Sequence, residues 1–273
     1  MLSKKDGLGV VIEILKMRFF RPGERPHKHS RNLVAIARDV LSRYSFSERR
    51  GQIDDYDLVQ IARVCLKGKL GINTCIKLCE NLSEAIAVNR VYTFDCPELL
   101  NIIARAYPLI FLDYFTEKHQ TIVKELRRMF DTAPDKAHGN PLNQIPDDDI
   151  IAWCEKNQDL RYTLIASAII PFSKSAKAGK WEWKAIALRI FEKAPDLSKI
   201  LQSFSEAILP MSWSGSLANL FQEELVLFES LYEHHNGEIR AWSKLQYSAL
   251  VEWIGKERES EARFDRERNE RFE

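Results

Sequence analysis

The five cysteines have the broadest chemistry in this chain, because a thiolate binds zinc or acts as a nucleophile. Cys75 and Cys79 stand one helical turn apart, whereas zinc sites usually carry more closely spaced pairs. Cys65, Cys75 and Cys79 fall on the apolar stripes of predicted helices, where cysteine behaves as a small hydrophobic side chain. The pattern therefore favours core packing over zinc binding. The full set is Cys65, Cys75, Cys79, Cys96 and Cys154.

An odd number of cysteines, without a secretory segment or a membrane-spanning apolar run, predicts free thiols in a reducing cytoplasm. We therefore expect a cytoplasmic protein that does not enter a membrane.

Three serines lie around a tryptophan and a glycine in the segment Ser212–Ser216. A nucleophilic serine of the elbow type needs the pattern Gly-x-Ser-x-Gly after a strand, and this segment has neither feature. Ser214 or Ser216 is better interpreted as the N-cap of the following helix.

Other polar clusters are explained by helix ends. Asp147–Asp149 suits the positive end of a helix dipole, although three carboxylates could also suggest a metal site. His234 and His235 are expected at a helix C-terminus, with Gly237 as a left-handed C-cap. No phosphate-binding loop is recognised, since Gly68–Gly71 lacks the Gly-Lys-Ser/Thr ending. We therefore predict no enzyme, and no catalytic, cofactor-binding or metal-binding residue.

The charge of the chain is unevenly distributed. Residues 1–50 contain 12 Lys/Arg and 5 Asp/Glu, a net charge of +7, whereas the remainder contains 28 and 34, a net charge of −6. A basic front end is suited to phosphate, to an acidic partner or to an acidic surface of the same protein. The candidate contacts are Lys16, Arg18, Arg21, Arg25, Lys28, Arg31, Arg49 and Arg50.

The elements that would position these residues are helices. Leu160–Ile170 is apolar nearly all round, which predicts a buried helix that ends before Pro171. Gly7–Phe20 is a predicted helix whose apolar side carries Val10, Val11, Ile14, Leu15 and Met17. A longer helix is expected from Pro108 to about Phe130, and Ser173–Lys180 is expected to be a loop.

The whole chain predicts an all-α protein, with antiparallel helix pairs stacked as a degenerate HEAT-like solenoid. We expect an N-terminal helical half (1–133), a loop (134–146), a C-terminal helical half (147–255) and a charged helical tail (256–273). In the last helix, a stripe that includes a buried Trp253 should dock on Leu217–Tyr232. Deletion of the tail should then cost little stability.

Several segments together resemble the C-terminal helical region of large bacterial STAND/NACHT-type NTPases and related proteins of anti-phage conflict systems. They are Asp54-Asp55-Tyr56 with Ile61-Ala62-Arg63, Arg161-Tyr162 through Pro171-Phe172-Ser173, Pro210 through Ser216, and Asp265 through Glu273. The resemblance implies a HEAT-like sensor or scaffold that normally follows a nucleotide-binding domain. It carries over no catalytic residue.

These observations predict a non-enzymatic scaffold or sensor module for protein recognition in a bacterial defence-type system. Its partner would be an effector, an NTPase chain or a phage protein. The alternative is a HEAT-like protein that binds nucleic acid through its basic N-terminal region, since helical-repeat DNA glycosylases show that such a scaffold can grip a duplex.

Overall fold

The computed structural model describes residues 5–19, 29–46, 55–129, 139–175, 179–209 and 214–270. The regular secondary structure of these residues is helical apart from a two-stranded hairpin, which confirms the predicted all-α class. The chain divides into two compact units, Met1–Ile169 and Ile170–Glu273. By residue number the loop 134–146 belongs to the first unit. The division into two helical halves on either side of that loop stays a prediction.

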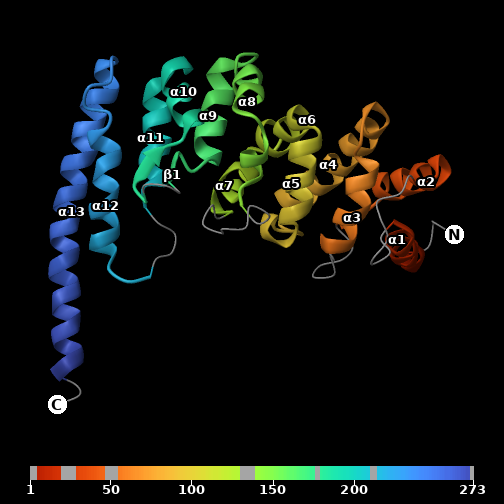
Figure 1. Cartoon of the computed structure of the whole chain (residues 1–273), viewed down its shortest axis with the longest axis horizontal. Coiled ribbons are helices and arrows are strands. Elements are labelled where there is room, and N and C mark those ends of the chain that lie inside the picture. The colour runs from red at the N-terminus through yellow and green to blue at the C-terminus, as the bar shows by residue number, and fades with distance from the viewer. Residues whose placement is uncertain are drawn as a thin grey trace. The chain divides into compact units, whose positions relative to one another are not determined.

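Unit 1 contains nine of the described α-helices. They are α1 (Lys5–Phe19), α2 (Arg31–Ser42), α3 (Asp55–Cys65), α4 (Ile72–Ala87), α5 (Pro97–Ala106), α6 (Pro108–Leu112), α7 (Gln120–Arg128), α8 (Asp147–Cys154) and α9 (Gln158–Ala168). Alternate helices pack together, α1 on α3, α3 on α5, α2 on α4 and α7 on α9 (Figure 1). Short helical turns lie between them: η2 (Lys69–Gly71), η3 (Thr93–Asp95), η4 (Asp113–Glu117) and η6 (Pro141–Gln144).

Helix α9 is the buried helix that the sequence predicts. Tyr162, Ile165 and Ala166 are fully or almost fully buried, as are most of their neighbours. The helix ends at Ala168, and Ile169 already has an extended backbone, so that the turn begins before Pro171. From α7, the guanidinium of Arg127 donates to the carbonyl oxygen of Ala166 over 2.7 Å.

The long helix predicted from Pro108 to Phe130 is interrupted, and that prediction is wrong. Helix α6 passes into a π-helical turn, η4, and α7 starts only at Gln120. The indole of Trp153 donates to Asp113, the first residue of that turn, over 2.7 Å. The guanidinium of Arg161 donates two hydrogen bonds, of 2.6 and 3.2 Å, to the carboxylate of Glu117, the last residue of the turn. The broken helix thereby gains two side-chain anchors from α8 and α9.

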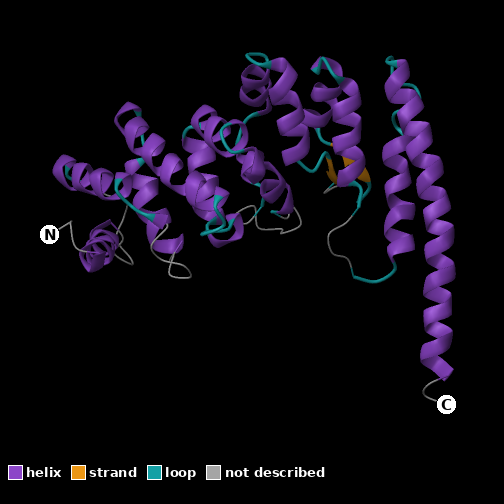
Figure 2. Ribbon diagram, turned by 180° about the vertical axis from the view of Figure 1, so that it is seen from behind, coloured by secondary structure: helices purple, strands orange, loops and turns teal. Residues whose placement is uncertain are grey.

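The described residues of unit 2 form two strands and four helices. They are β1 (Phe172–Lys174), β2 (Trp181–Trp183), α10 (Ala185–Lys193), α11 (Leu197–Ala207), α12 (Leu217–Glu229) and α13 (Gly237–Glu270). Figure 2 shows the small sheet in orange beside the helices. The hydrophobic core of unit 2 includes Phe172, Phe221 and Phe228, and Trp181, Trp183 and Trp242 pack against this core.

The hairpin corrects the predicted loop Ser173–Lys180. Strands β1 and β2 pair antiparallel, with Phe172 opposite Trp183. The indole of Trp183 donates to the carbonyl oxygen of Leu227 over 2.8 Å and so fixes the hairpin on α12. Each strand has three residues, which is too short for an alternating pattern to appear in the sequence.

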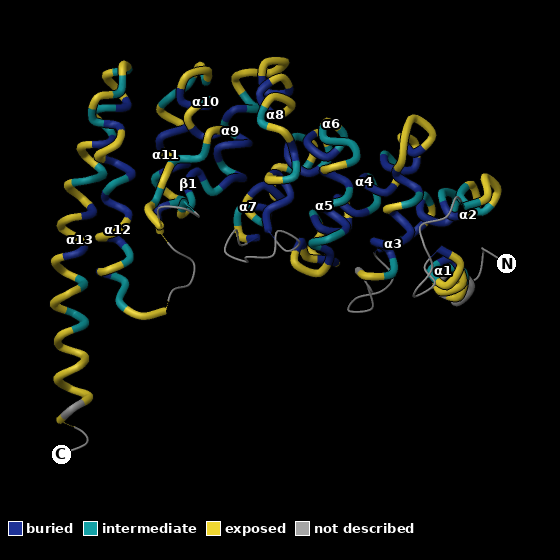
Figure 3. Tube along the Cα trace, in the orientation of Figure 1, coloured by how far each residue is buried: buried dark blue, intermediate teal, exposed yellow. Residues whose placement is uncertain are grey.

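Helices α12 and α13 form an antiparallel pair, as the sequence predicts (Figure 1). Ile239, Leu250 and Ile254 are buried, but Trp253 is 48% exposed, with its ring centre 5.5 Å from that of Phe221. The prediction of a buried Trp253 is therefore wrong. The charged tail continues α13 as a regular helix to Glu270, exposed along most of its length (Figure 3).

Candidate docking groove

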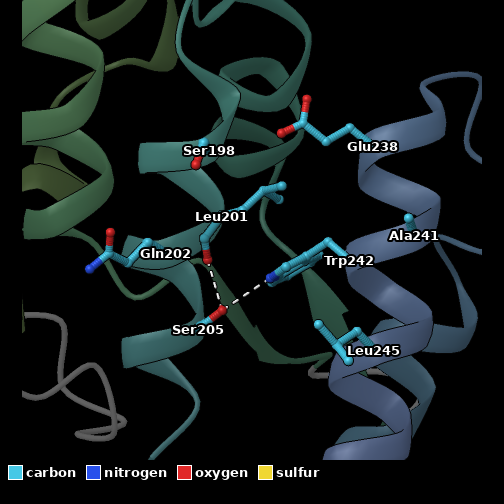
Figure 4. Close-up of a pocket in the computed structure, with 8 residues that line it drawn as sticks. All are labelled: Ser198, Leu201, Gln202, Ser205, Glu238, Ala241, Trp242 and Leu245. Carbon is cyan, nitrogen blue, oxygen red and sulfur yellow. Dashed lines mark hydrogen bonds between the residues drawn. The ribbon is translucent and has the colours of Figure 1, made fainter.

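A groove in unit 2 lies between α11 and the first half of α13. Its larger hollow has a volume of about 370 Å³ and is drawn in Figure 4. Four side chains from each helix line it: Ser198, Leu201, Gln202 and Ser205 from α11, and Glu238, Ala241, Trp242 and Leu245 from α13.

A second hollow of about 210 Å³ continues the groove and shares Ser205 with the first. Its lining is more apolar: Ile208, Leu209, Phe228, Gln246, Ala249, Leu250 and Trp253, together with Ser205. The α13 wall of the two hollows runs from Glu238 to Trp253, about 22 Å at the usual helical rise. The groove is thus long enough for about four turns of another helix.

The floor of the groove is held in place by Trp242. Its indole donates to the hydroxyl of Ser205 over 3.0 Å, and that hydroxyl donates to the carbonyl oxygen of Leu201 over 2.8 Å (Figure 4). The ring also contacts Phe191 and Phe228, with centroids 6.0 and 5.7 Å away. Because these contacts leave the indole little freedom, the groove is preformed.

Large apolar side chains remain exposed along this groove. Leu245 is 66% exposed, and Leu209 and Trp253 are each about half exposed. Small residues, Ser198 and Ala241 in the first hollow and Ala249 in the second, keep the walls low. Such a combination is typical of a surface that receives an amphipathic helix.

One carboxylate lines the groove, and two more are exposed on the same helices. Glu238 lines the first hollow, and Glu206 and Glu252 are exposed on the helices that form its two walls. Lys256 is 2.5 Å from Glu252, and the hydrogen bond from this lysine lowers the pKa of the Glu252 carboxyl. Because Glu252 already has Lys256 as its partner, Glu238 is the carboxylate of the lining that would favour an occupant with a cation.

The groove has no set of groups suited to catalysis. Its polar members are Ser198, Gln202, Ser205, Glu238 and Gln246, and no histidine, cysteine or lysine lines it. Across the described ranges, no three His, Cys, Asp or Glu side chains gather where they could hold a metal ion.

The cysteines lie where the sequence places them, in the core. All five are free and buried, and the sulfurs of Cys75 and Cys79 are 3.8 Å apart. Burial raises the pKa of the Cys65 thiol and of the Cys154 thiol to about 12. Burial also raises the pKa of the Cys79 thiol. These thiols are therefore protonated and poorly nucleophilic at neutral pH.

Three of the eight basic candidates lie in described residues. Lys16 forms an ion pair with Asp57 and lies 5.5 Å from the centre of the Tyr56 ring, while Arg18 and Arg31 are exposed. The structure thus assigns Lys16 a partner within its own unit. The remaining candidates fall outside the described residues: Arg21, Arg25, Lys28, Arg49 and Arg50.

The helix-end interpretations have different outcomes. Ser216 caps α12, since its hydroxyl accepts from the Asn219 backbone N–H over 3.1 Å, and Asp147–Asp149 forms the first turn of α8. The expected roles of His234 and Gly237 are wrong. Gly237 is the first residue of α13, and Asn236 before it is the N-cap. The side-chain oxygen of Asn236 accepts a hydrogen bond from the Glu238 backbone N–H over 2.8 Å. Burial lowers the pKa of His234, the opposite of a dipole-stabilised cation.

Sequence reasoning did not find the groove. Its signal is the row Ala241, Leu245, Ala249 and Trp253, in which small and large apolar residues alternate at helical spacing. That row lies beside the buried stripe of α13. The sequence pattern alone therefore assigns both the row and the stripe to the core.

Comparison with known proteins finds no matching family model and no matching curated protein. Among the described residues, no helix combines the length and the apolar character that a membrane crossing requires.

Proposed function

We propose that this chain is a non-enzymatic helical scaffold that recognises another protein, and that the α11/α13 groove is the recognition surface. The observation that carries the proposal is the preformed apolar groove in which Leu245 and Trp253 remain exposed. A monomeric protein rarely leaves several large apolar side chains exposed along one groove unless they contact a partner.

The finer architecture that we propose is a degenerate HEAT-like solenoid. The packing of alternate helices within unit 1, α1 on α3 on α5 and α2 on α4, supports it, since stacked helix pairs bring alternate helices into contact. The resemblance to STAND/NACHT-type C-terminal regions supports a bacterial defence-type setting. The partner would be an effector, an NTPase chain or a phage protein.

The test compares three forms of the purified full chain as baits in host extracts, with and without phage infection. They are the wild type, Leu245→Asp in the groove and Val251→Asp as the matched control, because Val251 is an exposed α13 residue that lines neither hollow. We expect a partner with the wild type and the control but not with Leu245→Asp. Equal recovery by all three baits would reject the groove as the recognition surface.

The alternative function, nucleic-acid binding, rests on the net charge of +7 in residues 1–50. It predicts that the affinity for duplex DNA falls linearly with salt on a log–log plot. Arg18→Ala and Arg31→Ala would then weaken binding and reduce the salt slope by about one unit each. Absence of binding at low salt, or binding that is independent of salt, would reject this alternative.

A further inference from the structure

The chain itself carries an apolar stripe that matches the groove. Helix α1 buries Ile12, Leu15 and Phe19, yet its opposite side exposes Val10, Ile14 and Met17, the last of them to 60%. The sequence predicts Val10, Ile14 and Met17 as part of the buried side, and that prediction is wrong. A helix that is apolar on two faces has one face left to bind something else.

The spacing of the stripe fits the spacing of the hollows. Val10 and Met17 are seven residues apart, which is about 10.5 Å along a helix. On α13 the two hollows are centred about eight residues apart, or about 12 Å. Two apolar anchors of α1 therefore reach both hollows, with Ile14 placed near the shared Ser205.

We propose that the α11/α13 groove is the docking site for helix α1 of a second copy of this chain. Met17 would enter the hollow lined by Trp242 and Leu245, and Val10 the hollow lined by Leu209 and Trp253. This inference rests on the proposed function of the groove as a recognition surface, and it names one occupant.

Charge favours this occupant and sets its direction. Helix α1 contains 3 Lys/Arg and 2 Asp/Glu, within residues 1–50 of net charge +7, whereas residues 170–273 contain 15 Lys/Arg and 17 Asp/Glu, a net charge of −2. Arg18 follows Met17 and is exposed, and Glu238 closes the end of the first hollow. With Met17 in that hollow, Arg18 of one copy would face Glu238 of the other.

The contact would be heterologous, because the two copies contribute different surfaces. Each copy keeps a free α1 stripe or a free groove after the first contact, so association continues into a ring or an open chain. A self-complementary dimer would instead use one patch on both copies.

The test is sedimentation velocity of the purified full chain over a range of concentrations and salt. We expect association that increases with concentration and weakens with salt. Met17→Asp and Leu245→Asp should each raise the dissociation constant about tenfold or more, because each removes an anchor. Val251→Asp, on α13 outside the groove, should associate like the wild type. If Met17→Asp perturbs the circular dichroism spectrum, Val10→Asp replaces it.

Mixing the two variants is the decisive experiment. The Met17→Asp copy keeps an intact groove and the Leu245→Asp copy an intact α1, so an equimolar mixture should form a one-to-one dimer that neither variant forms alone. Arg18→Glu and Glu238→Arg should each weaken association, and mixing the two variants should restore it. Three results would overturn the proposal: a wild type that is monomeric at all concentrations, association that both single variants retain, or a mixture that stays monomeric.

The capture experiment separates this inference from the proposed function. Loss of a cellular partner with Leu245→Asp but not with Met17→Asp, for a wild type that stays monomeric, supports the groove as a recognition surface and rejects α1 as its occupant. Self-association that both Met17→Asp and Leu245→Asp abolish, without any captured partner, supports α1 as the occupant of the groove and rejects recognition of a different protein there.

Discussion

The hydroxyl of Ser216 donates to the carboxylate of Glu261 over 2.8 Å, although 45 residues separate them in the chain. The other oxygen of Glu261 accepts from the backbone N–H of Ala218 over 3.3 Å. A carboxylate from α13 therefore lies at the N-terminus of α12, where the helix dipole favours negative charge. One part of the charged tail is thus a structural contact and not only a solvated extension.

This contact changes the expected cost of losing the tail. Glu261→Gln should lower the free energy of unfolding by about 1 kcal/mol, because it weakens two charge-assisted hydrogen bonds. Deletion of residues 257–273 should cost at least as much, contrary to the small effect that the sequence predicts. Urea unfolding of both variants measures this, with Glu267→Gln, an exposed tail residue, as the control. If the deletion leaves the free energy of unfolding unchanged, the Glu261 contact does not contribute to stability.

The two tryptophans of α13 should differ in their contribution to stability. Trp242→Ala should cost about 3 kcal/mol or more, since the indole packs on Phe191 and Phe228 and donates to Ser205. Trp253→Ala should cost only about 1–2 kcal/mol, because about half of that side chain is already in water. Thermal and urea melts decide between them, and the reverse order would contradict the burial described here.

Glu224 should make the stability of unit 2 depend on pH. It is only 3% exposed, and among the described residues no partner hydrogen-bonds to its Oε2. Burial raises the pKa of its carboxyl to about 8, while Lys174 lowers it and Glu223 raises it by smaller amounts. Because the folded state keeps the proton that the unfolded state releases near pH 4.3, the stability that Glu224 contributes is greatest below that pH and decreases as the pH rises towards 8.

The measurement is urea unfolding between pH 5 and pH 8. The contribution of this group should fall by about 1.4 kcal/mol per pH unit at most, and Glu224→Gln should flatten the profile. Glu229→Gln is the matched control, because Glu229 is an exposed carboxylate of the same helix. Parallel profiles for the wild type and Glu224→Gln would show that the carboxyl is already ionised in the folded state.

Two glycine substitutions should have opposite effects. A Cβ at Gly71 would lie 2.5 Å from the Tyr107 hydroxyl and 2.7 Å from the Cys65 carbonyl oxygen, so Gly71→Ala should cost about 1–3 kcal/mol. A Cβ at Gly255 would meet nothing within 4 Å, so Gly255→Ala should stabilise α13 by about 0.5–1 kcal/mol. Thermal melts of the two variants test both signs, and equal shifts would contradict them.

The sequence predicts buried elements better than surfaces in this protein. Helix α9, the core cysteines and the Ser216 cap follow from local patterns of apolar and capping residues, and these predictions are confirmed. The orientation of α1 and the exposure of Trp253 are not local properties. An apolar stripe shows that a helix packs against something, but not whether its partner lies in the same chain.

The hairpin and the π-helical turn were missed for a related reason. Three-residue strands leave no periodic pattern, and the interruption before α7 coincides with contacts from Trp153 and Arg161, 40 and 44 residues away in sequence. The residues that line the groove can be read from the sequence. The separation of α11 and α13, which leaves Leu245 exposed, cannot. The charge asymmetry was compatible with phosphate, with an acidic partner or with an acidic surface of the same protein, and that choice stays a prediction.

The position of Trp183 gives unit 2 an optical signature of its own. Its ring lies 5.5 to 6.3 Å from the rings of Phe191, Phe204, Phe228 and Trp242, within one aromatic cluster. Five of the six tryptophans fall in residues 170–273, and Trp153 alone belongs to the first unit. Emission and near-ultraviolet dichroism therefore report chiefly on unit 2, whereas the far-ultraviolet signal averages the helices of both. Any gap between the two transitions on heating measures how far the units melt independently.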